Sequence, residues 1–173
     1  NKSNVVAAIF MGSYFGVAET QVYEALENYI PNNNRSQQID FKGCHLIKDA
    51  YNANPSSMTS ALHSLIHTVK SPKVVILGDM LELGEDAVNI HENIGKNIDS
   101  ERLDYLITYG DLAYYIYNNA KDFYPEDHVF HFSEKEEMME KLKELIIPGT
   151  LVLVNASRSL HLETVVEELR DLD

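Results

Sequence analysis

Three short polar segments of the sequence follow apolar runs, and each carries side chains that could bind a ligand. Asp49 begins one segment, Asp79 lies between two glycines in the second, and Arg158 lies between two serines in the third. A carboxylate accepts hydrogen bonds from a ribose diol, an amine or a metal-bound water, whereas a guanidinium pairs with a carboxylate or a phosphate in bidentate geometry. These residue types predict a site for a polar ligand with an anionic group.

Each of these residues also has a purely structural interpretation. Asp49 at a strand end fits a cap for nearby amides as well as it fits a ligand contact, and Asn54 is more typical of a helix N-cap than of a binding residue. Gly78 and Gly84 fit close backbone approach or simple turn geometry equally well. A positive charge on Arg158 at a helix start opposes the helix dipole, which favours a binding role for this residue.

The sequence offers little sign of metal or disulfide chemistry. His63 and His67 have the four-residue spacing of a two-histidine metal pair. They lie off the apolar stripe of their predicted helix and no third ligand is suggested, so we predict no metal site. Cys44 is the single cysteine, which excludes an internal disulfide and fits a reducing compartment.

The elements that would position these residues follow an alternating pattern from residue 35 onward. Short apolar runs alternate with amphipathic segments, which is typical of a mostly parallel α/β sheet with helices on both faces. In such sheets ligands bind at the carboxyl ends of the strands, so we expect the three polar segments to share one edge. The predicted strands are 37–41, 44–49, 74–77, 104–108, 128–132 and 151–154.

Capping residues and apolar spacing predict three of the helices. Asn54 followed by Pro55 predicts one N-terminus, and Ser133 with Glu136 predicts a capping box at another. The first helix has an apolar stripe at positions 58, 61, 62, 65, 66 and 69, and the last helix has one at 162, 165, 166 and 169.

The amino-terminal residues form a separate part of the predicted organisation. Residues 5–15 are apolar nearly all round, as in a helix buried against something larger, and a second helix fits 19–29. Pro and Asn at 31–34 predict a linker. We therefore expect two parts, 1–31 and 32–173, and expect the first to pack on a structure that the chain does not contain.

Composition excludes several functional classes. Among 173 residues, 14 Lys and Arg against 27 Asp and Glu give a net charge of −13, which disfavours binding to nucleic acid or anionic lipid. No apolar run approaches the roughly 20 residues of a membrane span and no signal-peptide pattern opens the chain, so we expect a cytoplasmic protein without membrane insertion. The phosphate-loop and dinucleotide glycine motifs are also missing, which predicts no tight nucleotide binding by this chain alone.

Three motifs resemble the Mur ligase family: DAYNANPSSM at 49–58, LGDMLELG at 77–84 and SRS at 157–159. The resemblance covers essentially the whole chain. It implies that residues 1–31 are the carboxyl-terminal helical tail of the family's central ATP-binding domain, and that residues 32–173 are its carboxyl-terminal Rossmann-like domain. The amino-terminal and central domains would precede residue 1, so the chain would be a fragment.

The resemblance also implies an activity, an ATP-dependent ligase of peptidoglycan precursors for the cell wall. Such an enzyme joins D-alanyl-D-alanine to UDP-N-acetylmuramoyl-tripeptide through an acyl phosphate, with ATP and Mg²⁺ as the cofactors of the full-length enzyme. The domain represented here would close over ATP and position the amino substrate. We expect the fragment to be inactive alone, to hold no cofactor tightly and to carry no catalytic residue.

The site residues implied by the resemblance fall into two groups. Those facing the nucleotide would be Arg35, Asp49, Tyr51 and Asn52. Those facing the amino substrate would be Asn54, Asp79, Ser157 and Arg158. A buried carboxylate needs charge-assisted donors, so we assign the dipeptide carboxylate to Arg158.

The sequence departs from the family pattern at two places near the last strand. Asn155-Ala156 stands where the family usually has Lys-Gly, and His161 stands where Gly is common.

Two other functions compete with the ligase interpretation. The first is a non-enzymatic, receiver-like signalling module with Asp79 as phosphoacceptor, but Asn155 takes the place of the lysine that such a module needs. A dinucleotide-dependent oxidoreductase fails on the missing glycine fingerprint.

Overall fold

The structure, a computed structural model, describes residues 2–29, 37–49, 53–69 and 72–170. Internal contacts divide the chain into two compact units, Asn1–Pro31 and Asn32–Asp173.

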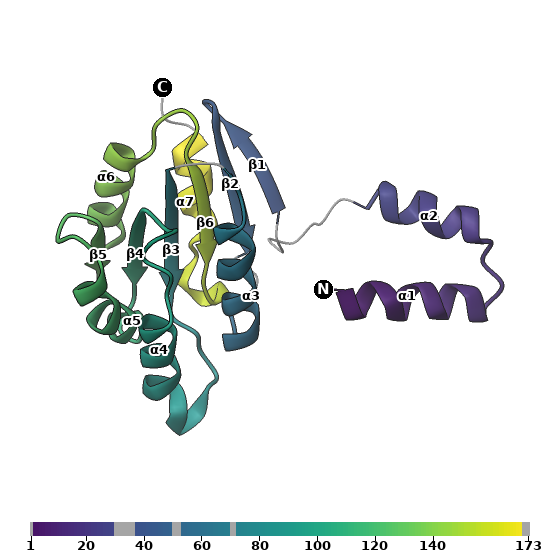
Figure 1. The fold of residues 1–173 in the computed structure, drawn as a ribbon, viewed down its shortest axis with the longest axis horizontal. Helices are drawn as coiled ribbons and strands as arrows, with labels where there is room; N and C mark the ends of the chain where they lie inside the picture. Colours follow the sequence, from purple (N-terminus) through teal and green to yellow (C-terminus); the bar gives the residue numbers. More distant parts are fainter. Residues whose placement is uncertain (1, 30–36, 50–52, 70–71, 171–173) are drawn as a thin grey trace. The chain divides into compact units, whose positions relative to one another are not determined.

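The first unit is a pair of helices with an exposed apolar surface. Helix α1 spans Lys2–Tyr14 and helix α2 spans Glu19–Glu27 (purple in Figure 1). Both were predicted, with α2 ending two residues earlier than expected. Large apolar side chains of this unit remain exposed, including Val6 at 65%, Phe10 at 68% and Phe15 at 73%. Within its own unit, therefore, α1 has no core to cover it.

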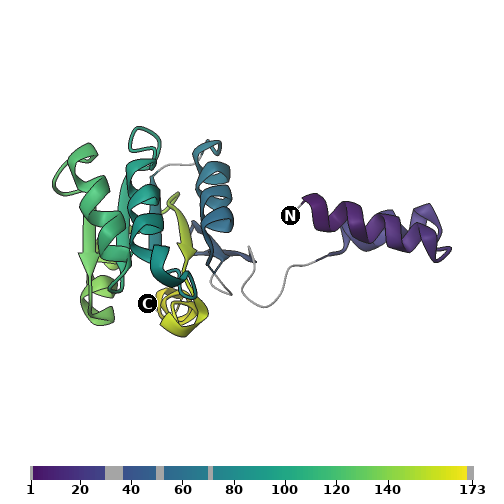
Figure 2. The same ribbon diagram turned by 90° about the horizontal axis from the view of Figure 1, so that it is seen from below.

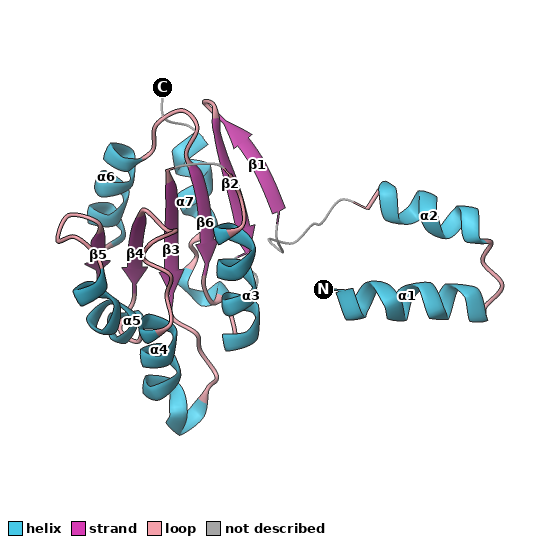
Figure 3. Ribbon diagram, viewed as in Figure 1, coloured by secondary structure: helices cyan, strands magenta, loops and turns pink. Residues whose placement is uncertain are grey.

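The second unit is built on a six-stranded sheet, shown in magenta in Figure 3. Its strand order is β1-β2-β6-β3-β4-β5, and every neighbouring pair is parallel except β1 with β2. The bounds are β1 Gln37–Phe41, β2 Cys44–Asp49, β3 Lys73–Gly78, β4 Tyr105–Tyr109, β5 Val129–Phe132 and β6 Leu151–Asn155. All six strands match the predicted runs to within about one residue at each end, so the predicted α/β class is confirmed.

Helices cover both faces of this sheet. One face carries α3 Pro55–Ile66, α4 Ala87–Lys96 and α5 Ala113–Ala120, and the other carries α6 Lys135–Leu145 and α7 Glu163–Arg170. Figure 2 shows α7, in yellow, on the side of the sheet opposite to α3. None of the described helices is long and apolar enough to cross a membrane.

The central strands β3 and β6 are buried along their whole length, which explains their continuous apolar sequences. Side chains alternate between two cores. Val75, Leu77 and Leu153 face α3, α4 and α5, whereas Ile76 and Val154 face α6 and α7. Complete burial stabilises each such side chain by roughly 1.5–3 kcal/mol.

Two predicted helix details are wrong. Val69 is fully exposed, because α3 stops at Ile66 and Val69 lies beyond its end. Ser133 and Glu136 do not form a capping box. The N-cap of α6 is Glu134, one residue later, and its side chain makes no capping hydrogen bond.

The apolar stripe predicted for the last helix is confirmed where it can be checked. Leu162, Val165 and Leu169 are buried, and the side chain of residue 166 lies outside the described set.

The β1–β2 hairpin turns through two residues that both have positive φ. Phe41 pairs with Cys44, and between them Lys42 has a φ of 45° and Gly43 a φ of 78°. Two-residue hairpin loops of this kind favour Asn or Asp before Gly, because a long side chain is disfavoured in the left-handed region.

We expect Lys42→Asn to stabilise the second unit by about 0.4–1 kcal/mol, because Asn tolerates the left-handed conformation better than Lys does. The free energy of unfolding, measured by urea denaturation, should rise. Gly43→Ala is the matched control and should lower it. A Lys42→Asn chain no more stable than the wild type would contradict this account of the turn.

Candidate functional site

The three polar segments meet at the carboxyl edge of the sheet, where β2, β6 and β3 end side by side. Asn155 Nδ2, at the end of β6, donates to Asp49 Oδ2 of β2 over 3.3 Å. Ser157 N, two residues further on, donates to Asp79 O after β3 over 3.0 Å. Hydrogen bonds therefore join the end of β6 to the segments that follow both of its neighbours.

The side chain of Asp79 is buried at this edge and does not project into solvent. Its side chain is only 7% exposed, and Oδ1 accepts from Ala113 N at the start of α5 over 2.7 Å. Gly110 has a φ of 108°, and a side chain there would overlap the Asp79 carboxylate, since an added Cβ would lie 2.6 Å from Oδ1. Asp79 thus connects the end of β3 to the amino terminus of α5. Burial raises the pKa of Asp79, against the opposing effect of the Ala113 hydrogen bond.

His91 supports the same loop and was not identified from the sequence. It is completely buried in α4, where its Nε2 accepts from Met80 N over 2.9 Å and its Nδ1 donates to Ala87 O over 2.7 Å. Both imidazole nitrogens are therefore used by the backbone, which fixes the segment after Asp79. The missed signal is its spacing, because His91 falls on the apolar stripe of α4 with Ile90 and Ile94.

A second histidine, His131 of β5, lies in an aromatic cluster near Asp79. Its Nδ1 is 3.0 Å from Thr108 Oγ1, and its ring lies 5.3 Å from that of Tyr114 and 5.8 Å from that of Tyr117. Burial lowers the pKa of His131, although the nearby charges of Asp79 and Asp111 act in the opposite direction. These side chains pack together beside the carboxyl edge of the sheet.

Ser157 and Arg158 have different places at this edge. Ser157 is 4% exposed, and its Oγ accepts from Leu81 N over 2.9 Å, so its hydroxyl holds the segment after β3. Arg158 begins a short 3₁₀ segment, Arg158–Leu160, and is exposed. It lines a cavity of about 400 Å³ together with Glu82, Ser159 and His161. A guanidinium beside a cavity can pair with a carboxylate or phosphate in bidentate geometry.

Two non-glycine residues of this cavity have left-handed backbones. Glu82 has a φ of 64° and His161 a φ of 50°. His161 ends the 3₁₀ segment in the conformation that Gly adopts most easily, which explains why Gly suits this position. Non-glycine residues held at positive φ often mark functional loops.

Asn155 and Asp49 form the other side of the edge. Asn155 is completely buried, and its Nδ2 bonds to Asp49 while its Oδ1 lacks a hydrogen-bond partner among the described residues. Asp49 is half-buried at the end of β2. The amide of Asn155 thus lies beside the Asp49 carboxylate, at the position where the resemblance implied a lysine.

Asn54 serves as a helix cap. Its Oδ1 accepts from Ser57 N over 2.9 Å, and Ser57 Oγ accepts from Asn54 N over 3.1 Å. This reciprocal pair is a capping box at the amino terminus of α3. The structural interpretation of Asn54 therefore accounts for its conformation. Arg35, Tyr51 and Asn52, the other predicted site residues, lie outside the described residues.

The sequence left open whether Gly78 and Gly84 serve close backbone approach or turn geometry, and the structure gives a different answer for each. A Cβ on Gly78 would lie 2.6 Å from the Ala156 Cβ and 2.8 Å from Leu160 Cδ1, so Gly78 is needed for close approach between the ends of β3 and β6. Gly84 has a φ of 63° and nothing within 4 Å of an added Cβ, so it serves turn geometry alone.

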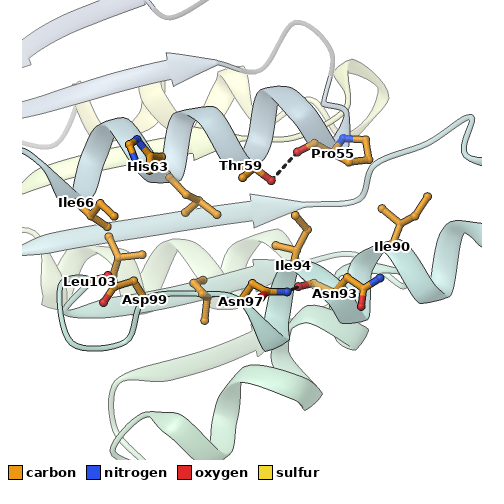
Figure 4. A pocket seen from close by; sticks show the side chains of 12 residues that line it. Pro55, Thr59, His63, Ile66, Ile90, Asn93, Ile94, Asn97, Asp99 and Leu103 are labelled. Atoms are coloured by element: carbon orange, nitrogen blue, oxygen red, sulfur yellow. Dashed lines mark hydrogen bonds between the residues drawn. The ribbon is translucent and has the colours of Figure 1, made fainter.

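A larger cavity, of about 510 Å³, lies away from this edge in the groove between α3 and α4 (Figure 4). Apolar side chains such as Leu62, Ile66 and Ile94 line it, with Thr59 and Asn93 among its polar residues. It contains none of the polar strand-end residues, so its size alone does not make it the functional site. Among the described residues, no group of three or more His, Cys, Asp or Glu side chains could hold a metal ion.

The comparisons with known proteins define the class first. Residues 34–158 match the family model "Mur ligase, glutamate ligase domain". The chain therefore belongs to the Mur ligase family, as its three motifs indicated.

Individual relatives within this family match nearly the whole of the chain. UDP-N-acetylmuramoyl-tripeptide--D-alanyl-D-alanine ligase of Bacillus subtilis (strain 168) is 36% identical over 172 residues, which cover 98% of this chain and 37% of the relative. A crystal structure of MurF from Acinetobacter baumannii matches with a TM-score of 0.86 at 26% identity, covering 98% of this chain and 37% of that chain. MurF ligase from Thermotoga maritima, in complex with ADP, shares the fold with a TM-score of 0.80 at 22% identity over 96% of this chain and 37% of its own. This chain spans about 37% of the length of these relatives.

The raised pKa of Asp79 predicts the sign of a pH effect. Its ordinary pKa is 3.8, so between that value and the higher pKa of the folded state, the folded chain binds the proton more tightly than the unfolded chain does. The contribution of Asp79 to stability is therefore greatest below pH 3.8 and falls as the pH rises through the folded-state pKa.

We expect the unfolding free energy of the wild type, relative to Asp79→Asn, to fall as the pH is raised from about 3.5 to about 7. Urea unfolding followed by circular dichroism at several pH values measures this difference. Exposed Glu126→Gln is the surface control. If the unfolding free energy of the wild type relative to Asp79→Asn instead rose with pH, the buried position would favour the charged form of Asp79.

We expect Gly78→Ala to destabilise the second unit by about 1–3 kcal/mol, because the added methyl overlaps Ala156. Ala156→Gly removes the methyl that it meets, so the double variant should lose less stability than the sum of the two single losses. Unfolding free energies of all four chains complete the cycle. Strict additivity would mean that the two positions do not press on each other.

Proposed function

We propose that this chain is the carboxyl-terminal domain of an ATP-dependent ligase that joins D-alanyl-D-alanine to UDP-N-acetylmuramoyl-tripeptide. The observation that carries the proposal is the cavity beside Arg158, formed where two of the motifs that place the chain in the Mur ligase family meet. The names of the relatives that it matches along 98% of its length give the substrates.

Arg158 is proposed to bind the carboxylate of the incoming dipeptide. A guanidinium offers two parallel N–H donors to a carboxylate, and the fixed direction of this pair would orient the amine at the other end of the dipeptide. Ser157, through its bond to Leu81, and Asp79, through its bond to Ala113, would hold the two loops that form the cavity. In this proposal Ser157 and Asp79 do not contact the substrate but hold in place the loops that surround it.

Asp49 is proposed to face the nucleotide. A carboxylate at a strand end accepts hydrogen bonds from a ribose diol, and the Asn155 amide beside it keeps one carboxylate oxygen oriented. Arg35, Tyr51 and Asn52 are proposed, by resemblance, to complete this contact. ATP supplies the phosphoryl group that activates the tripeptide carboxylate, and Mg²⁺ is proposed to bind with it in parts of the enzyme outside this chain.

Closure of this domain over the reacting groups is the proposed contribution to catalysis. An acyl phosphate hydrolyses if water reaches it, so excluding water while holding the amine in line favours ligation. We place the reaction in the cytoplasm, because ATP and nucleotide-linked precursors are its substrates.

Residues 1–31 are proposed to be the tail of the central ATP-binding domain. The exposed apolar side chains of α1, such as Phe10 and Tyr14, fit a surface that packs on the rest of that domain. The helices would then belong to a neighbouring fold unit and not to the sheet.

The receiver-like alternative is not favoured by the geometry. A phosphoacceptor aspartate must be accessible, but Asp79 is 7% exposed and accepts a backbone hydrogen bond from Ala113. Asn155, at the position of the required lysine, is completely buried and bonded to Asp49.

In the full-length enzyme, we expect Arg158→Ala to raise the KM for D-alanyl-D-alanine by roughly 10- to 100-fold, since a hydrogen bond to a charged group contributes about 1.5–3 kcal/mol. The KM for ATP should change little. Steady-state kinetics with each substrate varied in turn measure both constants.

Two controls sharpen this experiment. Arg158→Lys keeps the charge but not the bidentate geometry and should recover only part of the affinity. Arg102→Ala removes an exposed arginine that precedes β4, at the opposite edge of the sheet, and should leave both constants unchanged. A wild-type dipeptide KM in Arg158→Ala would exclude the proposed role of this residue.

A further inference from the structure

The exposed side of α3 carries two histidines that the ligase proposal does not use. His63 and His67 are both exposed and lie four residues apart along the helix. Their Nε2 atoms are 3.3 Å apart, and their ring centroids are 4.5 Å apart. The structure therefore brings the same nitrogen of both imidazoles close together, which the four-residue spacing alone, from which we predicted no metal site, did not show.

This separation is the one that a shared metal ion needs. Zinc binds imidazole nitrogen at about 2.0–2.1 Å in tetrahedral geometry, which places two nitrogen ligands about 3.3–3.4 Å apart. The hydrogen bond that joins the two rings without a metal has nearly the same length, so the two nitrogens already have the spacing of ligands that share one ion. The rings need only rotate to turn both lone pairs toward the ion, with the ring proton on Nδ1.

The helix holds the two rings in this relation. Asn54 and Ser57 cap the amino terminus of α3, and Met58 and Leu65 are completely buried against the sheet. His67 closes the carboxyl end with helical backbone angles, φ −87° and ψ −2°. The backbone is thus fixed before a ligand binds, and only side-chain rotation has to be restricted.

We propose that His63 and His67 form a binding site for one borderline divalent cation of the zinc, nickel and copper class. Imidazole ligands favour these metals over Mg²⁺ or Ca²⁺, and a net charge of −13 favours the approach of any cation. Because the described residues supply no third protein ligand, water completes the coordination shell. The ion lies beside the α3–α4 groove, which His63 also lines (Figure 4).

The site is independent of the ligase proposal. It lies on the outer surface of α3, and neither histidine lines the cavity beside Arg158. Loss of metal binding and loss of dipeptide binding would therefore be separate results.

The test uses the 173-residue chain titrated with ZnCl₂. Isothermal titration calorimetry gives the stoichiometry and the affinity, and NMR of the histidine ring protons identifies which imidazoles bind. We expect one ion per chain, with the largest shifts at His63 and His67. His63→Ala and His67→Ala should each weaken this binding at least about tenfold, because two ligands on a fixed backbone bind far better than one.

A matched variant keeps the number of histidines constant. His63→Ala combined with Ser60→His places the two imidazoles seven residues apart on the same face, about 10.5 Å along the helix, too far to share an ion. This chain should bind zinc as weakly as His63→Ala alone. His128→Ala, which removes a half-buried histidine next to β5, should bind zinc like the wild type.

Three results would overturn the proposal. They are the absence of zinc binding to the wild type, binding that survives His63→Ala at the wild-type affinity, and equal affinity in the Ser60→His, His63→Ala chain. Circular dichroism should show the same helix content in every variant, since Ser60, His63 and His67 are exposed and His128 lies outside the helices.

Discussion

The close approach of the ends of β3 and β6 is the constraint on which the site depends. Gly78 leaves just enough room for the Ala156 methyl, and this contact brings Ser157 within hydrogen-bonding distance of Asp79. Ser157 then binds Leu81 as well, so that two loops far apart in sequence form one wall. A bulky residue at position 78 would separate the strand ends before any ligand contact could be made.

The sequence predicted well whatever depends on local pattern. Continuous apolar runs identified the strands, because buried parallel strands need them, and Asn54 was recognised as a cap from its neighbours alone. The capping box at Ser133 failed because the chain had a second place, one residue later, at which to begin the helix. The loops were expected at one edge because parallel strands end there, although each residue's partner could not be foreseen.

What the sequence could not show were contacts between distant segments. His91 supports the loop after Asp79 by accepting from Met80 N, and Asp79 accepts from Ala113 N at the start of a helix 34 residues further along the chain. Such partners depend on how the helices pack over the sheet, which residue spacing does not encode. The same limit applies to Asn155, whose amide meets Asp49 from 106 residues away.

The position of β6 has a consequence for how the domain is made. Among the described strands, β6 comes last in the sequence but fills the middle of the sheet, so nothing joins β2 to β3 until β6 has been synthesised. Nascent chains that end before residue 151 would expose two open strand edges, which are prone to aggregation. Deleting β6 would therefore remove the centre of the sheet and not its margin.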